Sequence, residues 1–100
     1  MTTFQTIAEV RAANRAADLH FFDRHTMNYF HSRIESKLYG GRYFITSEAD
    51  YYLSTFPRRY TVRRANDDGS IDTVGDFQAY ATIDEARYAA KDAALREAQS

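Results

Sequence analysis

Arginine and tyrosine side chains gather in two short segments of the sequence, where they can contact anions or other proteins. Residues 58–64 read Arg-Arg-Tyr-Thr-Val-Arg-Arg, and residues 41–45 read Gly-Arg-Tyr-Phe-Ile. Guanidinium groups bind phosphates and aromatic rings stack on bases, so these segments are candidates for nucleic-acid contact. Tyrosine and arginine also anchor the centres of protein interfaces. The candidate binding residues are Arg42, Tyr43, Tyr51, Tyr52, Arg58, Arg59, Arg63 and Arg64.

A run of acidic residues bears on the choice between these two kinds of surface. Residues 66–85 contain six acidic side chains and no basic one. If residues 66–69 form a tight turn, the strands on either side of it pair two arginines with two aspartates on one solvated face. The expected pairs are Arg63 with Asp72 and Arg59 with Asp76. Cross-strand ion pairs are therefore favoured over arginines that are free to bind phosphate.

The histidines and the acidic turn lack the spacing of a metal site. No two of His20, His25 and His31 are three or four residues apart, as two ligands on one helix would be. The turn resembles a calcium loop, but Arg64 takes the first ligand position and Gly75 the place of the closing glutamate. No motif marks an activated serine or a phosphate-binding glycine loop. We expect no catalytic residue, no metal and no cofactor; a small hydrolase is a third hypothesis that no motif supports.

The composition is that of one folded domain spanning residues 1–100. Hydrophobic residues make up 44% of the chain and aromatic residues 15%, which is more than a disordered segment carries. The net charge of −1 provides no long-range attraction to nucleic acid or to an anionic membrane. The sequence has no cysteine and no apolar run of the roughly 18 to 20 residues that a membrane span needs. We therefore expect a cytoplasmic protein without membrane contact.

Two helices are expected in the N-terminal half. Thr6 and Glu9 have the form of a capping box, and apolar residues then recur at helical spacing over residues 7–19. Asp23 can cap a second helix that ends at Gly40. The apolar stripe of this second helix is Met27, Phe30, Ile34 and Leu38.

About three antiparallel strands are expected to follow. Residues 42–47 and 58–65 are rich in β-branched and aromatic residues, and residues 70–81 complete a hairpin around the turn. In this register Tyr60 lies opposite Gly75. The expected core face of the hairpin carries Tyr60, Val62, Ile71, Thr73, Gly75, Phe77 and Ala79.

A capped helix is expected at the C-terminus. Thr82 and Glu85 form a second capping box, and Asp92 and Arg96 have the spacing of an i,i+4 ion pair. A narrow face of small residues should let the helix lie close to the sheet; its members are Ile83, Ala86, Ala90, Ala93 and Ala94. The expected fold class is α+β, with two N-terminal helices, a small antiparallel sheet of about three strands and a C-terminal helix packed on the sheet.

Several segments together resemble a known family. The most specific is residues 39–48, Tyr-Gly-Gly-Arg-Tyr-Phe-Ile-Thr-Ser-Glu, and the similarity extends over roughly residues 21–94. The chain resembles a family of short hypothetical proteins of bacteriophages and other mobile elements, a domain of unknown function. The resemblance implies an accessory viral product in the cytoplasm of the host bacterium, and it carries over no catalytic residue.

Two hypotheses about function follow. The leading one is a non-enzymatic phage accessory protein that acts by protein–protein interaction. Its partner would be a host factor, a component of a defence system, another phage protein or a second copy in a homo-oligomer. The alternative is a nucleic-acid-binding module that uses the strand of arginines and tyrosine. The alternative predicts an affinity that falls steeply with salt, because phosphate contacts release counterions.

Overall fold

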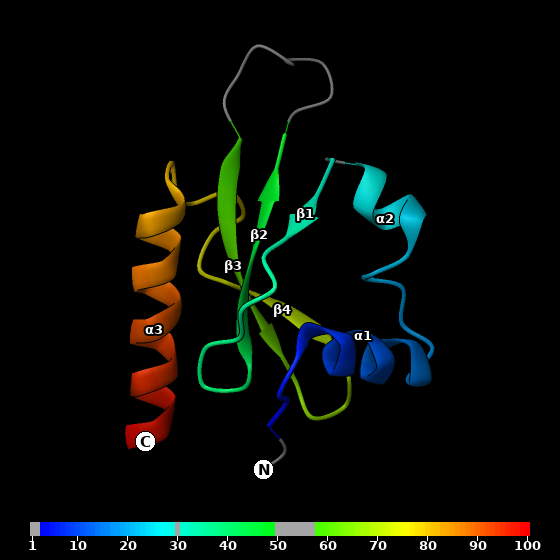
Figure 1. The fold of residues 1–100 in the computed structure, drawn as a ribbon, viewed down its shortest axis with the longest axis horizontal. Coiled ribbons are helices and arrows are strands. Elements are labelled where there is room, and N and C mark those ends of the chain that lie inside the picture. The colour runs from blue at the N-terminus through cyan, green and yellow to red at the C-terminus, as the bar shows by residue number, and fades with distance from the viewer. Residues whose placement is uncertain (1–2, 30, 50–57) are drawn as a thin grey trace.

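The computed structural model describes residues 3–29, 31–49 and 58–100, and it has the α+β class that the sequence predicts (Figure 1). The described residues form three helices and one antiparallel sheet of four strands in the order β1-β2-β3-β4. The elements are α1 (Ile7–Ala16), α2 (Arg24–Tyr29), β1 (Arg33–Ile34), β2 (Tyr43–Glu48), β3 (Arg59–Ala65), β4 (Ile71–Val74) and α3 (Ile83–Gln99). The sheet thus has four strands rather than about three.

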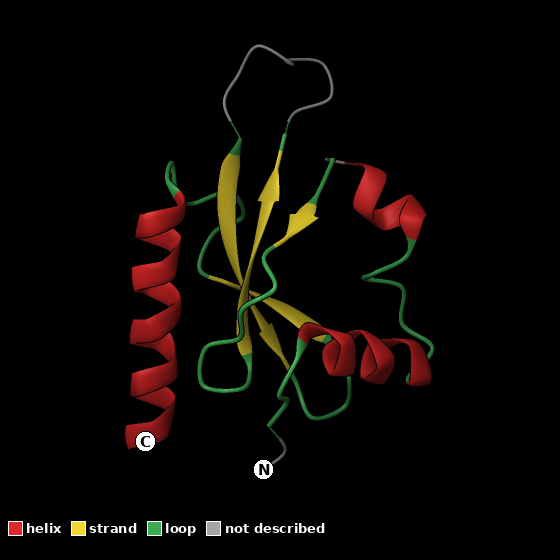
Figure 2. Ribbon diagram, in the orientation of Figure 1, coloured by secondary structure: helices red, strands yellow, loops and turns green. Residues whose placement is uncertain are grey.

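Different helices cover the two faces of the sheet (Figure 2). Side chains alternate between the faces along each strand, so Phe44 and Ala65 lie on one side while Ile45 and Val62 lie on the other. Phe44 belongs to a buried cluster with Val10 of α1, whereas Ile45 belongs to a second cluster with alanines of α3. We call these two sides the α1 face and the α3 face.

The two long helices begin where the capping boxes predict. The hydroxyls of Thr6 and Thr82 accept hydrogen bonds, each of 3.2 Å, from the amides of Glu9 and Glu85. Both predicted N-caps are confirmed. α1 ends earlier than predicted, because Asp18 has a left-handed φ of 59° and turns the chain out of the helix.

The prediction of the second helix is wrong over most of its length. α2 has only six residues. His31 follows it with a left-handed φ of 50°, and the Ser32 amide donates to the Met27 carbonyl at 2.7 Å. β1 then pairs with β2, and Ile34 packs against the α1-face cluster from this strand. The apolar spacing fits an extended segment as well as a helix, and Phe30 lies outside the described residues.

The hairpin between β3 and β4 is confirmed, but its predicted register is wrong by one residue. Its loop spans residues 66–70, because Asp68 accepts hydrogen bonds from both the amide and the hydroxyl of Ser70 and keeps Ser70 out of the strand. Arg63 therefore faces Thr73. A slip of one residue moves every side chain of a strand to the other face, so the predicted core face is wrong for β4.

β4 is also shorter than predicted, because the chain leaves the ladder at Gly75. Gly75 and Gln78 have left-handed φ values of 76° and 56°, and the chain returns where Tyr80 pairs with Tyr60. The predicted pairing of Tyr60 with Gly75 is therefore wrong. We call residues 75–79, which lie outside the ladder, the excursion.

α3 runs along the sheet (Figure 1), and its alanines belong to the buried cluster on the α3 face. Ala86 and Ala90 are completely buried, as the predicted narrow face requires. The predicted ion pair between Asp92 and Arg96 is confirmed at 2.9 Å. In the described part of the chain, neither α3 nor any other helix is long and apolar enough to cross a bilayer.

Candidate functional site

The predicted binding residues lie on both faces of the sheet, and most of them contact partners inside the protein. Arg42 is only 1% exposed. Its guanidinium donates to the Ala65 carbonyl at 3.0 Å and forms an ion pair with Asp67. Arg42 therefore joins the start of β2 to the hairpin loop.

Arg64 and Tyr43 form a second internal group on the α3 face. Arg64 Nε donates to the Glu97 carboxylate of α3 at 2.9 Å, and this hydrogen bond raises the pKa of Arg64 above its ordinary value. The guanidinium carbon lies 6.0 Å from the centroid of the buried Tyr43 ring. Arg64 thus contacts α3 and covers Tyr43, and it is Arg64 that faces Asp72 across the strands.

Glu48 and Arg63 form a buried charge cluster on the α1 face. Glu48 is 1% exposed, and its carboxylate accepts hydrogen bonds from the hydroxyls of Thr46 at 2.5 Å and Thr61 at 2.7 Å. Arg63 donates to the same carboxylate at 3.3 Å and to the Thr73 hydroxyl at 2.6 Å. We call these five side chains the Glu48–Arg63 cluster.

Two aromatic rings lie against the Arg63 guanidinium. Its carbon is 5.3 Å from the centroid of Phe21 and 5.5 Å from that of Phe77, distances at which a cation is attracted to a ring. Burial lowers the pKa of Arg63, while the charge of Glu48 acts in the opposite direction. The charge of Arg63 is therefore compensated by Glu48, and its guanidinium is covered by two aromatic rings. Its predicted pairing with Asp72 is wrong.

Arg59 contacts the excursion through neutral groups. It donates to two backbone carbonyls there, at 2.7 and 3.1 Å. The predicted ion pair with Asp76 is wrong, because the excursion turns carbonyl oxygens toward Arg59 instead. The predicted binding residues Tyr51 and Tyr52 lie outside the described residues.

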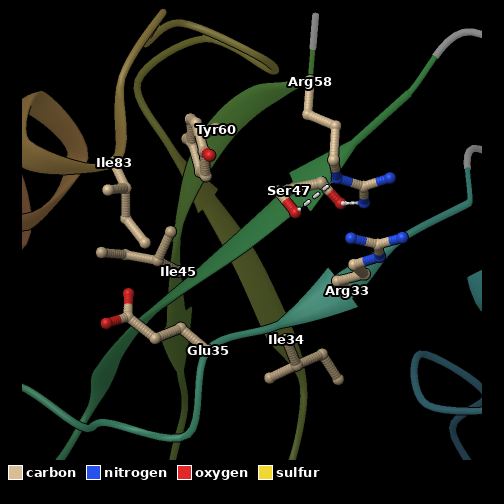
Figure 3. A pocket seen from close by; sticks show the side chains of 8 residues that line it. All are labelled: Arg33, Ile34, Glu35, Ile45, Ser47, Arg58, Tyr60 and Ile83. Carbon is tan, nitrogen blue, oxygen red and sulfur yellow. Dashed lines mark hydrogen bonds between the residues drawn. The ribbon is translucent and has the colours of Figure 1, made fainter.

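Arg58 differs from the other four arginines because it lines a pocket of about 250 Å³ on the α3 face (Figure 3). Its guanidinium donates to the Ser47 hydroxyl at 3.0 Å, to the Ser47 carbonyl at 2.7 Å and to the His31 carbonyl at 2.6 Å. All three acceptors are neutral. We call this the Arg33–Arg58 pocket; it is lined by Arg33, Ile34, Glu35, Ile45, Ser47, Arg58, Tyr60 and Ile83.

Arg33 is a residue of this pocket that the sequence does not mark as a candidate. The sequence predicts a helix at this position, whereas β1 places Arg33 opposite Ser47 and beside Arg58 (Figure 3). No hydrogen bond or ion pair links its guanidinium to any other residue that the structure describes. Burial, and then the charge of Arg33, lower the pKa of Arg58. No spacing in the sequence marks this pair, because the two arginines meet only through β2.

The outer side of α3 carries exposed apolar side chains. Tyr88 is 75% exposed and Leu95 is 61% exposed, and the i,i+7 spacing places both on one side of the helix. Each borders a shallow hollow, Tyr88 together with Tyr80 and Leu95 together with Leu38. We call this the Tyr88–Leu95 surface.

The fold and these sites define an α+β protein that has a basic pocket and an exposed apolar surface on α3. Among the described residues, no three histidine or acidic side chains gather as metal ligands would. The chain belongs to the family of unknown function DUF7447, whose family model matches residues 6–91. No curated protein and no solved structure matches it. Membership in a family of unknown function is thereby confirmed, and a phage origin stays a prediction.

Proposed function

We propose that this protein is a non-enzymatic interaction domain that binds another protein through the Tyr88–Leu95 surface. The observation that carries the proposal is the exposure of these two large side chains on a helix whose Ala86 and Ala90 are completely buried against the sheet. Exposed aromatic and aliphatic side chains next to hollows are typical of the anchors of protein interfaces, because burying them removes apolar surface from water.

The partners of the arginines support this proposal over the nucleic-acid alternative. Arg42, Arg63 and Arg64 each have a carboxylate partner, and Arg59 holds two carbonyls. Phosphate binding by these side chains would have to break contacts that the fold already uses. We expect no binding of DNA or RNA even at low salt. Binding that weakens steeply as salt is raised would support the alternative instead.

The resemblance to proteins of bacteriophages and mobile elements supports a partner in the bacterial cytoplasm. A host factor or a component of a defence system would then be the bound protein. A second copy of this chain is the other protein that can cover the Tyr88–Leu95 surface, and it would make a homo-oligomer.

The test compares the wild type with the double variant Tyr88→Ser/Leu95→Ser. Both are used as bait in a bacterial lysate and measured by size-exclusion chromatography with light scattering. The double variant should weaken recovery of the partner, or self-association, by about tenfold or more, as loss of interface anchors does. Its free energy of unfolding should stay within about 0.5 kcal/mol of the wild type, because both positions are exposed.

Arg15→Ser is the matched control, because Arg15 is exposed on α1 away from this surface. It should behave as the wild type does in both assays. A wild type that stays monomeric at every concentration and recovers nothing above background would contradict the proposal.

A further inference from the structure

Two positive charges lie side by side in the Arg33–Arg58 pocket, and none of the residues drawn in Figure 3 places a carboxylate between them. Arg58 donates only to neutral oxygens, and Arg33 donates to no other described residue. Burial, and then the charge of Arg33, disfavour the charged form of Arg58 and lower its pKa, while the charge of Glu48 acts in the opposite direction. Neighbouring positive charges in a concave site that form no ion pair with a described residue are typical of ligand-binding sites.

The nearby carboxylates are already used elsewhere. Glu35 lines the same pocket, but its Oε1 forms an ion pair of 3.0 Å with Arg87. Glu48 follows Ser47 in β2 and therefore points to the opposite face, where it binds Arg63. Among the described residues, no carboxylate accepts a hydrogen bond from either guanidinium group, and Glu48 acts on Arg58 only through its charge.

The rest of the pocket suits an apolar group. Ile45 and Ile83 form one wall together with the Tyr60 ring, and the Ser47 hydroxyl lies between this wall and the two arginines (Figure 3). The volume of about 250 Å³ is below the range of roughly 300 to 1,000 Å³ that is usual for larger organic ligands. The space therefore fits a charged head and one small apolar body.

We propose that the Arg33–Arg58 pocket binds a small ligand in which an oxyanion, a carboxylate or a phosphate, is joined to an apolar group. The two guanidinium groups bind the oxyanion through charge-assisted hydrogen bonds, and the isoleucine and tyrosine side chains contact the apolar group. Glu35 disfavours a ligand with a second negative charge at its other end. The proposal goes beyond the protein interaction and uses none of the residues on which that interaction depends.

Three probes test the ligand chemistry by calorimetry at constant ionic strength. Phenyl phosphate and benzoate carry the two kinds of head on the same ring, and benzamide is the neutral analogue. We expect at least one of the two anions to bind and benzamide not to bind. The tighter anion identifies the head group. The proposal is overturned if neither anion binds, or if benzamide binds as tightly as the anions do.

Arg33→Gln is the decisive variant, because Arg33 donates no hydrogen bond to any other described residue. Arg58, in contrast, also donates to Ser47 and His31, so its loss could disturb the fold. Loss of one charge-assisted contact should weaken binding of the anion by roughly tenfold or more without lowering the Tm. Arg15→Gln on α1 is the control and should bind as the wild type does. An Arg33→Gln protein with wild-type affinity would overturn the proposal, because the anion would then bind without the Arg33 guanidinium.

Discussion

The Glu48–Arg63 cluster and the Arg33–Arg58 pocket place the same side chain in opposite situations on the two faces of one sheet. Arg63 has the Glu48 carboxylate at 3.3 Å, and the rings of Phe21 and Phe77 lie against its guanidinium. Arg58 has three neutral acceptors and a second arginine beside it. The difference comes from β2, which sends Glu48 to the α1 face and its neighbour Ser47 to the α3 face.

This comparison separates an arginine that stabilises the fold from one that is available to a ligand. Removing one partner of a buried ion pair leaves the other charge without compensation, which is destabilising. Removing one member of a pair of like charges relieves repulsion. Neutralising one charge should therefore lower the free energy of unfolding at the Glu48–Arg63 cluster and leave it unchanged or raise it at the Arg33–Arg58 pocket.

The largest effect is expected from Glu48→Gln, which leaves the Arg63 guanidinium on the α1 face without its carboxylate. The free energy of unfolding in urea should fall by about 3 to 5 kcal/mol. Glu97→Gln is the matched control, because it removes the carboxylate of a less buried pair with Arg64, whose side chains are 24% (Arg64) and 22% (Glu97) exposed, and should cost only about 0.5 kcal/mol. Equal losses of unfolding free energy in the two variants would contradict the prediction that burial of the Glu48–Arg63 pair makes its disruption more costly.

If Glu48→Gln does not fold, the double variant Glu48→Gln/Arg63→Met keeps the prediction testable. It removes both charges and leaves an apolar side chain of similar length between the rings of Phe21 and Phe77. Most of the lost stability should return, because no uncompensated charge remains. A double variant no more stable than the single one would show that the threonines, rather than the charge pair, hold Glu48.

The next largest effect is expected on the α3 face from Ala90→Leu. Ala90 is completely buried between α3 and the sheet, so the larger side chain should push the helix away and cost about 1 to 3 kcal/mol of unfolding free energy. Ala98→Leu, the same change at an exposed position of α3, should stay within about 0.5 kcal/mol. Similar effects at both positions would contradict close packing of α3 through its alanines.

The parts of the fold that depend on neighbouring residues were predictable from the sequence. The two N-caps, the alanine face of α3 and the pair of Asp92 with Arg96 each depend on side chains within one or two helical turns. The hairpin was predictable as an element, but its register depends on whether Ser70 belongs to the loop. Asp68 decides this with two side-chain hydrogen bonds, which the pattern of apolar residues does not reveal.

The two charged sites on the sheet were not predictable because they depend on pairings between distant segments. Glu48 meets Arg63 only through the register of β2 with β3, and Arg33 meets Arg58 only because β1 is a strand. The apolar spacing around Ile34 predicts a helix, which would have carried Arg33 away from β2. The sequence analysis therefore named Arg59 and Arg63 as candidates but assigned them the wrong partners.

A much smaller effect on stability is expected from Arg33→Gln than from the same change at Arg63. Arg33→Gln should leave the free energy of unfolding within about 0.5 kcal/mol of the wild type, or raise it, because the substitution removes repulsion with Arg58. Arg63→Gln leaves the buried Glu48 carboxylate without its cation and should cost several times more. Urea unfolding of the two variants side by side measures the contrast. Losses of the same size would mean that Arg33 is a structural residue.

The smallest effect is expected at alkaline pH from Tyr39, which is buried on the α3 face. Burial, and then the charge of Glu35, raise the pKa of Tyr39 above 10.0, while Arg87 acts in the opposite direction. Above pH 10 the unfolded chain loses this proton before the folded protein does. The contribution of Tyr39 to stability is therefore complete below pH 10 and is lost as the pH rises through the folded-state pKa.

Tyr39→Phe removes this titration, so the free energy of unfolding should fall less steeply above pH 10 in the variant than in the wild type, with parallel curves at lower pH. Tyr88→Phe removes the same atom at an exposed position and should follow the wild type. Urea unfolding at a series of pH values measures the difference. The single variant Glu35→Gln is the fourth protein. Its free energy of unfolding should fall somewhat less steeply above pH 10 than that of the wild type, because the Glu35 charge no longer raises the pKa of Tyr39. Equal slopes in all four proteins would contradict the raised pKa of Tyr39 and, with it, the placement of Glu35 beside Tyr39 and Arg87.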